Sequence, residues 1–466
     1  MKKKLFDCVI IGSGSGGYVA AIRAAQRGLV TALIEAREIG GTCLNRGCIP
    51  SKALIASANV FKKIQEANKF GIYVQDLYFD YAQMKHRKDS IVNGIQKSLE
   101  KLILSNKITI FNGYGRMISP YEVAITGKDE GILEAKNIIL ATGSEPRPLE
   151  KIPYDYKKIH DSTSLLNMTE LPKKMAIIGG GVIGCEFASL YNTLGVDVTI
   201  VELLPHLLPN EGRNVQETLT ASFKRQGIKI ETTTIVKKIS YQDDGIRLYL
   251  EDQRLLDADI VLVSIGRKYN TDAIGLDKAG VVVEEDGSIP TDEMMRTNIP
   301  HIFAIGDITG KWIFAHVASH QGLIAADNIA GQLNYMHYNA IPAVIFTNPE
   351  VATIGLTLEK AIQEGYDAIL GKFPFQALGK SQVMIETEGF AQIVAEKNTG
   401  QILGAQVVGS GAGNLIAEIG LAIGSELTVD SITETIHAHP TTAEAWIEAA
   451  FLTKDMPLHL PPRIRR

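Results

Sequence analysis

The stretch LFDCVIIGSGSGGYVAAIRAAQRGLVTALIE, residues 5–35, decides the fold of this chain. Its apolar beginning, Leu5 to Ile11, predicts a β-strand that runs into a glycine-rich turn at residues 12–17. The alanine-rich segment from Tyr18 to Arg27 predicts a helix, and Leu29 to Glu35 predicts a second strand. Because strands that alternate with helices form parallel sheets, the stretch predicts an α/β fold with a dinucleotide-binding turn.

The same pattern returns in MAIIGGGVIGCEFASLYNTLGVDVTIVE, residues 175–202. Each copy has the glycine spacing G-x-G-x-x-G, with the glycines at Gly12, Gly14 and Gly17 and again at Gly179, Gly181 and Gly184. Each copy also ends on a carboxylate at the same distance from its first glycine, since 35 − 12 = 23 and 202 − 179 = 23 positions. Two purely structural turns would rarely share strand, helix and acid, so the repeat predicts two related nucleotide-binding domains.

The two carboxylates, Glu35 and Glu202, can accept hydrogen bonds from ribose hydroxyls. In such a motif the first glycine permits a tight turn, the second lets the backbone approach a pyrophosphate, and the third packs the helix against the strand. Glu202 would also repel a 2′-phosphate, and no arginine follows it until Arg213. The second domain is therefore predicted to bind NAD rather than NADP.

Length and composition limit the class of protein. With 466 residues the chain exceeds a single core and predicts roughly two to four domains. The net charge is 47 − 52 = −5, which argues against a nucleic-acid partner. We find no apolar stretch near the roughly 20 residues that a membrane helix needs, so we expect no membrane association and a cytoplasmic protein.

The pattern changes beyond Ile341. Short alternating segments at Ala391–Glu396 and Ile402–Val408 predict antiparallel strands, and helices are expected at Leu415–Leu427 and Thr441–Leu452. This last block therefore predicts an α+β domain.

Two of the four cysteines lie in GGTCLNRGCIPSK, residues 40–52, directly after the first nucleotide motif. Residues five apart do not face each other in one helix, so we expect Cys43 in a loop and Cys48 in the first turn of a helix. Pro50 suits an early helical position, and the helix N-terminus would favour a Cys48 thiolate. This context favours a redox-active pair.

Three other interpretations of the pair stay open at this point: a zinc site, a structural disulfide or two inert thiols. Zinc requires further Cys or His ligands at suitable spacing, whereas Cys8 and Cys185 lie in other elements and are expected to be buried thiols. A structural disulfide is improbable in a reducing cytosol.

Five ordered motifs resemble those of the flavoprotein disulfide reductases, class I of the pyridine nucleotide-disulfide oxidoreductases, and most closely those of the members that oxidise dihydrolipoamide. They are the cysteine motif at 40–52, ATG at 141–143, GGGVIGCE at 179–186, Thr297 to Asp307 and HAHPTTAE at 437–444. The resemblance implies two Rossmann-like dinucleotide-binding domains plus a C-terminal α+β dimerisation domain. The implied boundaries are 1–150 for the first part of an FAD-binding domain, 151–268 for an NAD-binding domain, 269–340 for a return segment of the FAD-binding or central domain, and 341–466 for the dimerisation domain.

The resemblance also implies roles for residues. Cys43 would exchange thiols with the substrate, Cys48 would form the charge-transfer contact with FAD, and His439 with Glu444 would form the catalytic dyad across a homodimer interface. Lys52 would lie beside the flavin with Glu186 as its partner, and Asp307 would contact the FAD ribityl chain. The cofactor-binding residues for FAD and NAD are expected to be Gly12, Gly14, Gly17, Glu35, Lys52, Gly115, Thr142, Gly143, Gly179, Gly181, Gly184, Glu186, Glu202, Gly266, Asp307 and Ala315, and no metal is expected.

The residues support some of these roles independently. Thiol exchange needs a base that works near neutral pH, which suits a histidine such as His439, and a carboxylate such as Glu444 can hold the other ring nitrogen. A structural histidine, or a metal cluster with His437, is the alternative for His439. Lys52 has the alternative of a solvent-facing helix lysine, and Glu186 that of a first-turn acid favoured by the helix dipole.

The implied activity is the NAD-dependent oxidation of protein-bound dihydrolipoamide through a redox-active disulfide and FAD. The expected partner is a lipoyl-bearing acyltransferase (E2) of a 2-oxo acid dehydrogenase complex or the H-protein arm of glycine cleavage. Glutathione reductase or mercuric reductase activity is the alternative, but Glu202 disfavours NADPH and the C-terminal segment after Pro461 has no cysteine. Arg46 stands between the cysteines where relatives commonly carry valine.

Overall fold

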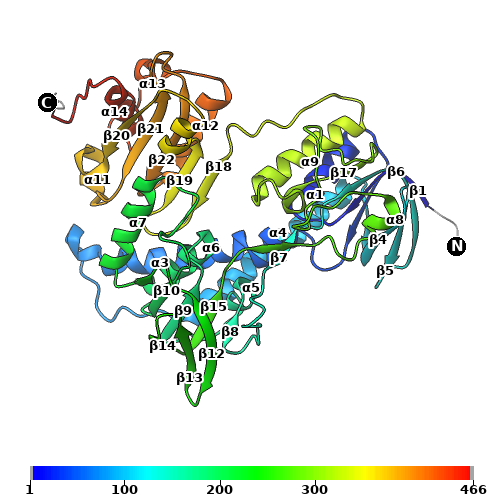
Figure 1. The fold of residues 1–466 in the computed structure, drawn as a ribbon, viewed down its shortest axis with the longest axis horizontal. Helices are drawn as coiled ribbons and strands as arrows, with labels where there is room; N and C mark the ends of the chain where they lie inside the picture. Colours follow the sequence, from blue (N-terminus) through cyan, green and yellow to red (C-terminus); the bar gives the residue numbers. More distant parts are fainter. Residues whose placement is uncertain (1–3, 462–466) are drawn as a thin grey trace. The chain divides into compact units, whose positions relative to one another are not determined.

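The computed structural model describes residues 4–461, whose chain divides into two compact units (Figure 1). The first unit runs to Tyr156 and takes in His160–Glu170 and Ile265–His337. The second consists of Lys157–Ile159, Leu171–Ser264 and the chain from Tyr338 onward. The predicted α/β class is confirmed, because each unit contains a parallel sheet with helices.

The first unit is built on a parallel sheet with the strand order β3-β2-β1-β6, and β17 pairs with the end of β6. The strands are β1 (Lys4–Ile11), β2 (Thr31–Glu35), β3 (Thr109–Asn112), β6 (Gly131–Leu140) and β17 (Ile302–Ala304). Helices α1 (Ser15–Gln26) and α9 (Ala315–Ile329) pack closely on each other. Val9, Ile138 and Ile302 are fully buried in the sheet, as expected for apolar runs in parallel strands.

Other elements complete the first unit. An antiparallel extension of the sheet consists of β4 (Tyr114–Ser119) and β5 (Glu122–Thr126), and a small ladder joins β7 (Ser144–Pro146) to β16 (Arg267–Tyr269). The cysteine motif forms α2 (Gly41–Arg46) and the start of α3 (Cys48–Gln65), and α3 packs against α4 (Tyr81–Ser105).

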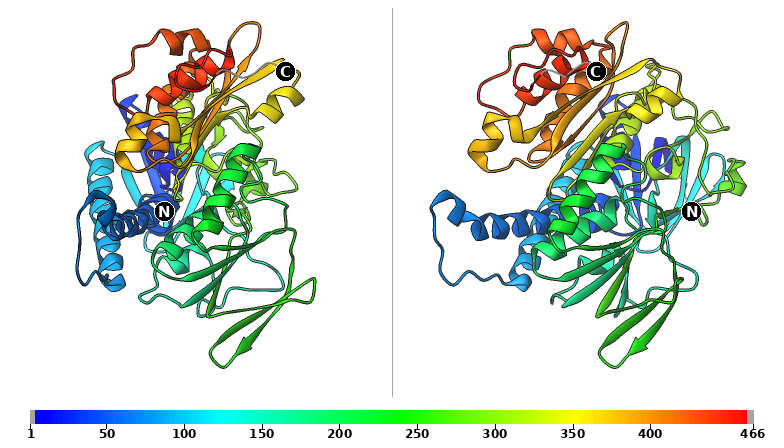
Figure 2. Two further views of the ribbon diagram at one scale, coloured as in Figure 1. Left: turned by 90° about the vertical axis from the view of Figure 1, so that its left-hand side faces the viewer. Right: turned by 60° about the vertical axis from the view of Figure 1, so that its left-hand side comes forward.

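The second unit contains a second parallel sheet, with β11, β10, β9 and β15 in that order. These strands and their helices are β9 (Lys174–Ile178), β10 (Asp197–Val201), β11 (Lys229–Glu231), β15 (Ile260–Val263), α6 (Val182–Thr193) and α7 (Arg213–Arg225). A separate antiparallel sheet, drawn in green in Figure 2, consists of β12 (Val236–Gln242), β13 (Gly245–Leu250) and β14 (Leu255–Ala258).

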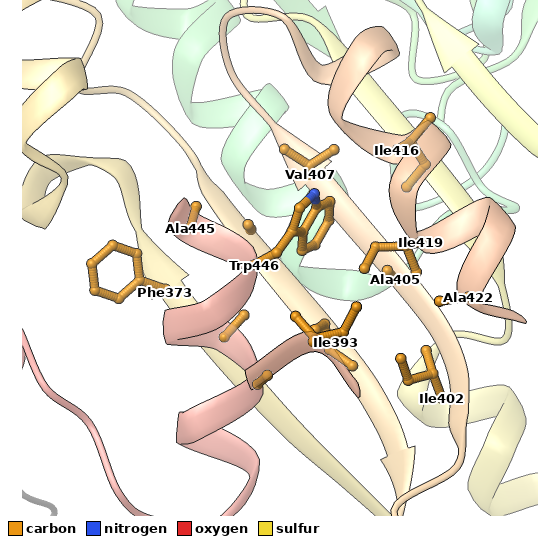
Figure 3. Close-up of a cluster of buried hydrophobic side chains, with 14 of the residues drawn as sticks. Phe373, Ile393, Ile402, Ala405, Val407, Ile416, Ile419, Ala422, Ala445 and Trp446 are labelled. Atoms are coloured by element: carbon orange, nitrogen blue, oxygen red, sulfur yellow. The ribbon is translucent and has the colours of Figure 1, made fainter. Parts of the chain in front are cut away.

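The C-terminal part of the second unit is an antiparallel sheet with helices, in the order β18-β19-β22-β21-β20. Its elements are β18 (Pro342–Ile345), β19 (Val351–Gly355), β20 (Ala368–Pro374), β21 (Phe390–Glu396), β22 (Ile402–Val408), α12 (Ala412–Gly424), α13 (Val429–Glu434) and α14 (Glu444–Thr453). Trp446 is fully buried among Phe373, Ile393 and Val407 (Figure 3), and its indole N–H donates to the Leu415 carbonyl at 3.1 Å. The predicted α+β block beyond Ile341 is thus confirmed.

Some elements differ from the sequence predictions. The segment from Thr297 to Asp307, whose sequence predicts one strand ending at Gly306-Asp307, contains only the three-residue strand β17 and then a 3-10 turn at Gly306–Thr309, because its chain bends at Gly306 with a φ of +75°. Helix α12 begins at Ala412, three residues before the predicted Leu415, and ends at Gly424.

Candidate active site

In the first glycine turn, two of the three glycines of the motif are required by close packing within the protein, and the third leaves open space. Gly12 adopts a φ of +103°, and a Cβ there would lie 2.3 Å from the Ala141 carbonyl oxygen. A Cβ on Gly17 would lie 1.9 Å from the Gly12 oxygen, so helix and strand approach too closely for any side chain. A Cβ on Gly14 would meet no atom within 4 Å. The backbone at Gly14 is therefore open to a ligand at the N-terminus of α1, where a phosphate is stabilised.

The second turn repeats this pattern. Gly179 has a φ of +110° with the Ser264 oxygen 2.4 Å from a hypothetical Cβ, and Gly184 would place its Cβ 2.0 Å from the Gly179 oxygen. A Cβ on Gly181 again meets nothing within 4 Å, at the N-terminus of α6. Both turns therefore fit a dinucleotide pyrophosphate, and the residues present can hold FAD on the first module and NAD on the second.

The two predicted ribose carboxylates are held in matching ways. Glu35 accepts from the Ser13 N–H at 2.9 Å and from the Arg37 N–H at 2.8 Å. Glu202 accepts from the N–H groups of Gly180 and Leu204. In each case backbone N–H groups from the glycine turn and from two residues beyond the acid fix the carboxylate at the end of the second strand.

The structure places Asp307 in a polar cluster that the sequence did not reveal. The Ser144 hydroxyl donates to the Asp307 carboxylate, and the Arg267 Nε lies 3.7 Å from the same carboxylate. Arg267 also donates to the Ser144 hydroxyl and carbonyl, both at 2.6 Å. Burial lowers the pKa of Arg267, while the charges of Asp307 and Cys48 act against this shift. The orientation of the Asp307 carboxylate is therefore fixed by Ser144 on β7 and Arg267 on β16.

Cys43 and Cys48 lie together. Both are thiols in the structure, and their side chains share a hydrogen bond that, together with burial, raises the pKa of Cys43. Cys48 is the first residue of α3, as predicted, and Pro50 lies in its first turn. Cys43 was expected in a loop but belongs to α2, a short helix that ends at Arg46, and Gly47 alone separates it from α3.

Cys43 also has polar neighbours. The Ser15 hydroxyl forms a hydrogen bond with Cys43, which lowers the pKa of the thiol. The positive charge of Lys52 also lowers this pKa. Arg46, the residue between the cysteines, has its guanidinium 3.7 Å from the Glu38 carboxylate. The arginine charge is therefore partly balanced by Glu38.

Cys8 and Cys185 are fully buried, as predicted. Burial raises the pKa of Cys8 to about 12 and also raises the pKa of Cys185. Both are therefore inert thiols near neutral pH.

His439 and Glu444 form a hydrogen-bonded pair. The His439 Nδ1 lies 2.7 Å from the Glu444 Oε1, and the Thr441 N–H donates to the other carboxylate oxygen at 2.8 Å. Burial alone would raise the pKa of Glu444, but the hydrogen bonds from His439 and Thr441 outweigh it and lower that pKa. The His439 side chain is 77% exposed.

The remaining predicted residues occupy defined positions. Thr142 and Gly143 bond to Asn270, through the Thr142 hydroxyl at 2.8 Å and the Gly143 carbonyl at 2.9 Å. Ala315 is the first residue of α9, and Gly266 lies just before β16 with a φ of +118°.

Gly115 has a packing reason to be glycine, since a Cβ there would lie 3.1 Å from Ile11 and 3.2 Å from Ile34. Glu186 is buried and accepts from the Phe346 N–H at 3.0 Å within the second unit. Lys52 belongs to the first unit, and its pairing with Glu186 stays a prediction.

Sequence reasoning missed Ser144, Arg267, Ser15 and Thr441, although Ser144 directly follows the ATG motif and Arg267 directly follows Gly266. Within residues 4–461, the structure contains no group of three His, Cys, Asp or Glu side chains arranged to hold a metal. No helix over the same residues is long and apolar enough to cross a membrane.

Two dinucleotide turns, a cysteine pair and a histidine–glutamate pair define a flavin-dependent disulfide oxidoreductase. The chain belongs to the pyridine nucleotide-disulphide oxidoreductase family, whose model matches residues 6–322. The dimerisation domain of the same family matches residues 341–450 and supports the predicted homodimer. The family assignment confirms the predicted fold class, the enzyme class and the cofactors FAD and NAD.

Among its relatives, the chain is 54% identical to the dihydrolipoyl dehydrogenase of Chlamydia pneumoniae, with 98% of this chain and 99% of that protein covered. It is 39% identical to the mitochondrial dihydrolipoyl dehydrogenase of Pisum sativum, with 97% and 92% covered. Among solved structures, LpdA from Mycobacterium tuberculosis has a TM-score of 0.90 at 27% identity, with 96% of this chain and 99% of that chain covered. The resemblance to the dihydrolipoamide-oxidising members is thereby confirmed.

Proposed function

We propose that this chain oxidises dihydrolipoamide, carried on the arm of an acyltransferase or of an H-protein, to lipoamide with reduction of NAD⁺. The observation that carries the proposal is the contact between Cys43 and Cys48 directly behind the first dinucleotide turn. The dihydrolipoyl dehydrogenase names of relatives with matching length support the substrate class. Glu202, at the end of β10, supports NAD as the nucleotide, because a 2′-phosphate would face its carboxylate.

The protein residues supply thiol exchange and proton transfer. His439 accepts a proton from a thiol of dihydrolipoamide, and Glu444 on Nδ1 stabilises the imidazolium that results. The substrate thiolate attacks the Cys43 sulfur of a Cys43–Cys48 disulfide, which forms a mixed disulfide and releases the Cys48 thiolate. The second substrate thiol then attacks the substrate sulfur of the mixed disulfide, and its proton passes to the Cys43 thiolate that departs. Lipoamide leaves oxidised, and the cysteine pair is left reduced by two electrons, as a Cys43 thiol and a Cys48 thiolate.

Bound FAD would supply the electron-transfer chemistry that links the cysteine pair to the nicotinamide of NAD⁺. The residues that would hold it are the turn at Gly12–Gly17, Glu35 and Asp307, and those that would hold NAD are the turn at Gly179–Gly184 and Glu202. The contacts with Ser144 and Arg267 would fix the Asp307 carboxylate for this role.

We further propose that the homodimer completes the site, with His439 of one protomer serving the cysteine pair of the other, and that the protein works in the cytoplasm. A histidine that is 77% exposed in the single chain suits a role at such an interface.

The test is the Cys43→Ser variant. We expect it to lose dihydrolipoamide-dependent NAD⁺ reduction while it retains FAD and NADH oxidation by ferricyanide, because the artificial acceptor needs no thiol exchange. Cys8→Ala, which removes a buried thiol from β1, is the matched control and should keep both activities. Normal dihydrolipoamide turnover in Cys43→Ser would overturn the proposal.

A further inference from the structure

We infer that His437, paired with Glu418, is a positioning residue that fixes the loop carrying His439. This inference rests on the proposed function, in which His439 is the base. The loop joins α13 to α14, and its residues 435–443 belong to neither helix. A base on such a loop needs contacts that hold it, since misplacement by about 1 Å can reduce a rate by roughly a hundredfold.

Exposure differs sharply between side chains of this loop. Ile436 is 97% exposed, the side chain of His437 is only 5% exposed, and that of His439 is 77% exposed. The chain thus buries a polar ring in this loop. Since burial of a polar group is unfavourable unless its hydrogen bonds are made, His437 must find specific partners.

Both ring nitrogens of His437 face hydrogen-bond acceptors. The Nδ1 lies 3.0 Å from the Thr435 carbonyl oxygen, and the Nε2 lies 2.7 Å from the Glu418 Oε1 on α12. A neutral imidazole has a single N–H donor, so both contacts form together only when the pair holds one further proton, on the ring or on the carboxyl group. The contact between the His437 Nε2 and the Glu418 carboxyl group is therefore a short hydrogen bond that holds the loop against α12.

The other side of the loop has its own fixed points. The Thr441 hydroxyl donates to the Ala438 carbonyl at 2.7 Å, and the Thr441 N–H donates to Glu444 at 2.8 Å. His439 is therefore held between two anchors, His437 before it and Thr441 after it. The His437 ring is buried against a half-buried Glu418, so the pair joins the loop to α12 by a contact of defined geometry, which suits a positioning role.

The experiment compares His437→Ala, Glu418→Ala, Glu418→Gln and the double variant His437→Ala/Glu418→Ala as FAD-loaded enzymes. Each alanine variant should lower kcat for dihydrolipoamide-dependent NAD⁺ reduction roughly ten- to a hundredfold, with ferricyanide reduction by NADH unchanged. Glu418→Gln keeps an acceptor oxygen for Nε2–H, but the contact with the Thr435 carbonyl then requires a protonated ring, so its kcat should fall only partly and stay above that of both alanine variants. The double variant should lose no more than the worse single variant, because both changes remove one contact.

Asp430→Ala is the matched control, because Asp430 pairs with Lys454 between α13 and α14 without touching the loop. Its kcat should equal that of the wild type, as expected for an exposed pair. If the wild-type enzyme does not oxidise dihydrolipoamide, the proposed function itself is wrong. If the wild type is active and kcat is unchanged in His437→Ala and Glu418→Ala, only this inference is wrong.

If the alanine variants do not bind FAD, the kcat of His437→Gln tests the positioning role instead. Its amide can donate to Glu418 but cannot also reach the Thr435 carbonyl, so its kcat should fall below that of Glu418→Gln. Equal and wild-type kcat values in both glutamine variants would overturn the inference.

Discussion

Single residues around Cys43 determine how readily its thiol ionises. The hydrogen bond with Cys48 and burial raise the pKa of Cys43, whereas Ser15 and Lys52 lower it. Arg46 is closer in sequence but lies against Glu38. The chemistry of the pair is therefore tuned by the start of α1 and the second turn of α3 more than by the residue between the cysteines.

Lys52→Met should move the ionisation of Cys43 to higher pH, since it removes a cation that lowers the pKa of the thiol. In the reduced holoenzyme, alkylation of Cys43 by iodoacetamide should become slower at a given pH and need a higher pH for the same rate. Mass spectrometry of the alkylated peptide at a series of pH values measures this shift. Arg46→Val is the control with a smaller expected shift, and a larger shift in that variant would contradict the account.

Glu444→Gln should reduce dihydrolipoamide turnover roughly a hundredfold, because His439 loses the carboxylate that stabilises its charged form. Its effect on stability should depend on pH. The folded-state pKa of Glu444 is lower than the ordinary value of 4.5, so the ionised carboxylate stabilises the fold above that value and this stabilisation is lost as the pH falls through the folded-state pKa.

Thermal unfolding of both proteins from neutral to acidic pH measures this effect. The advantage of the wild type over Glu444→Gln should be largest near neutral pH and should shrink below pH 4.5. An advantage that grows on acidification would show that the pair is not ionised as described.

At the scale of elements, each glycine turn has one glycine that is open to a ligand and another that is needed for packing. Substitutions at these glycines should therefore affect ligand binding and folding separately. Gly181→Val adds a side chain on the open side of the second turn, where a Cβ meets no protein atom within 4 Å. It should leave the protein folded and yellow but raise the KM for NAD⁺ at least tenfold, about 1.4 kcal/mol of lost binding. Gly184→Val adds a Cβ 2.0 Å from the Gly179 oxygen and should instead destabilise the protein by several kcal/mol.

Steady-state kinetics and thermal unfolding distinguish the two glycine variants. A Gly181→Val enzyme with an unchanged KM for NAD⁺ would contradict the placement of the nucleotide at the second turn. Loss of stability in that variant equal to that of Gly184→Val would contradict the steric assignment.

The elements also show what the sequence predicts well and what it does not. Strands β1 and β22 follow from short apolar runs with clear ends, and β22 begins and ends at the predicted Ile402 and Val408. Helix α1 begins at Ser15, before the predicted Tyr18, because the last glycines of the turn are already helical. The α2 helix around Cys43 was missed, since six residues flanked by glycines carry no helical periodicity. Ser144 and Arg267 meet through a ladder between distant segments, which local pattern does not reveal.

At the scale of the whole molecule, exposed apolar side chains of the dimerisation domain point to where a second protomer packs. Ile436 is 97% exposed beside His437, and Leu421 on α12 is 71% exposed. Such side chains are typical of an interface when they lie on a domain that mediates association. The loop of His439 would then be part of the contact between protomers.

Ile436→Asp should weaken the dimer, because it would bury a carboxylate in that contact. Analytical ultracentrifugation should show dissociation at concentrations where the wild type is dimeric, together with lower dihydrolipoamide turnover that recovers at higher protein concentration. Lys397→Asp, which changes a charge on the exposed Lys397–Asp367 pair, is the control and should remain dimeric. A fully dimeric Ile436→Asp protein would remove this loop from the predicted interface.

The account depends on a disulfide between Cys43 and Cys48 that accepts two electrons from dihydrolipoamide, which are then passed on to NAD⁺. Counting free thiols in denatured enzyme, before and after anaerobic reduction by NADH, tests it most directly. Of the four cysteines, only Cys8 and Cys185 should react in the oxidised enzyme, and all four should react after reduction. Four reactive thiols before reduction of the freshly purified, active enzyme, or no gain of two thiols on adding NADH, would contradict the account.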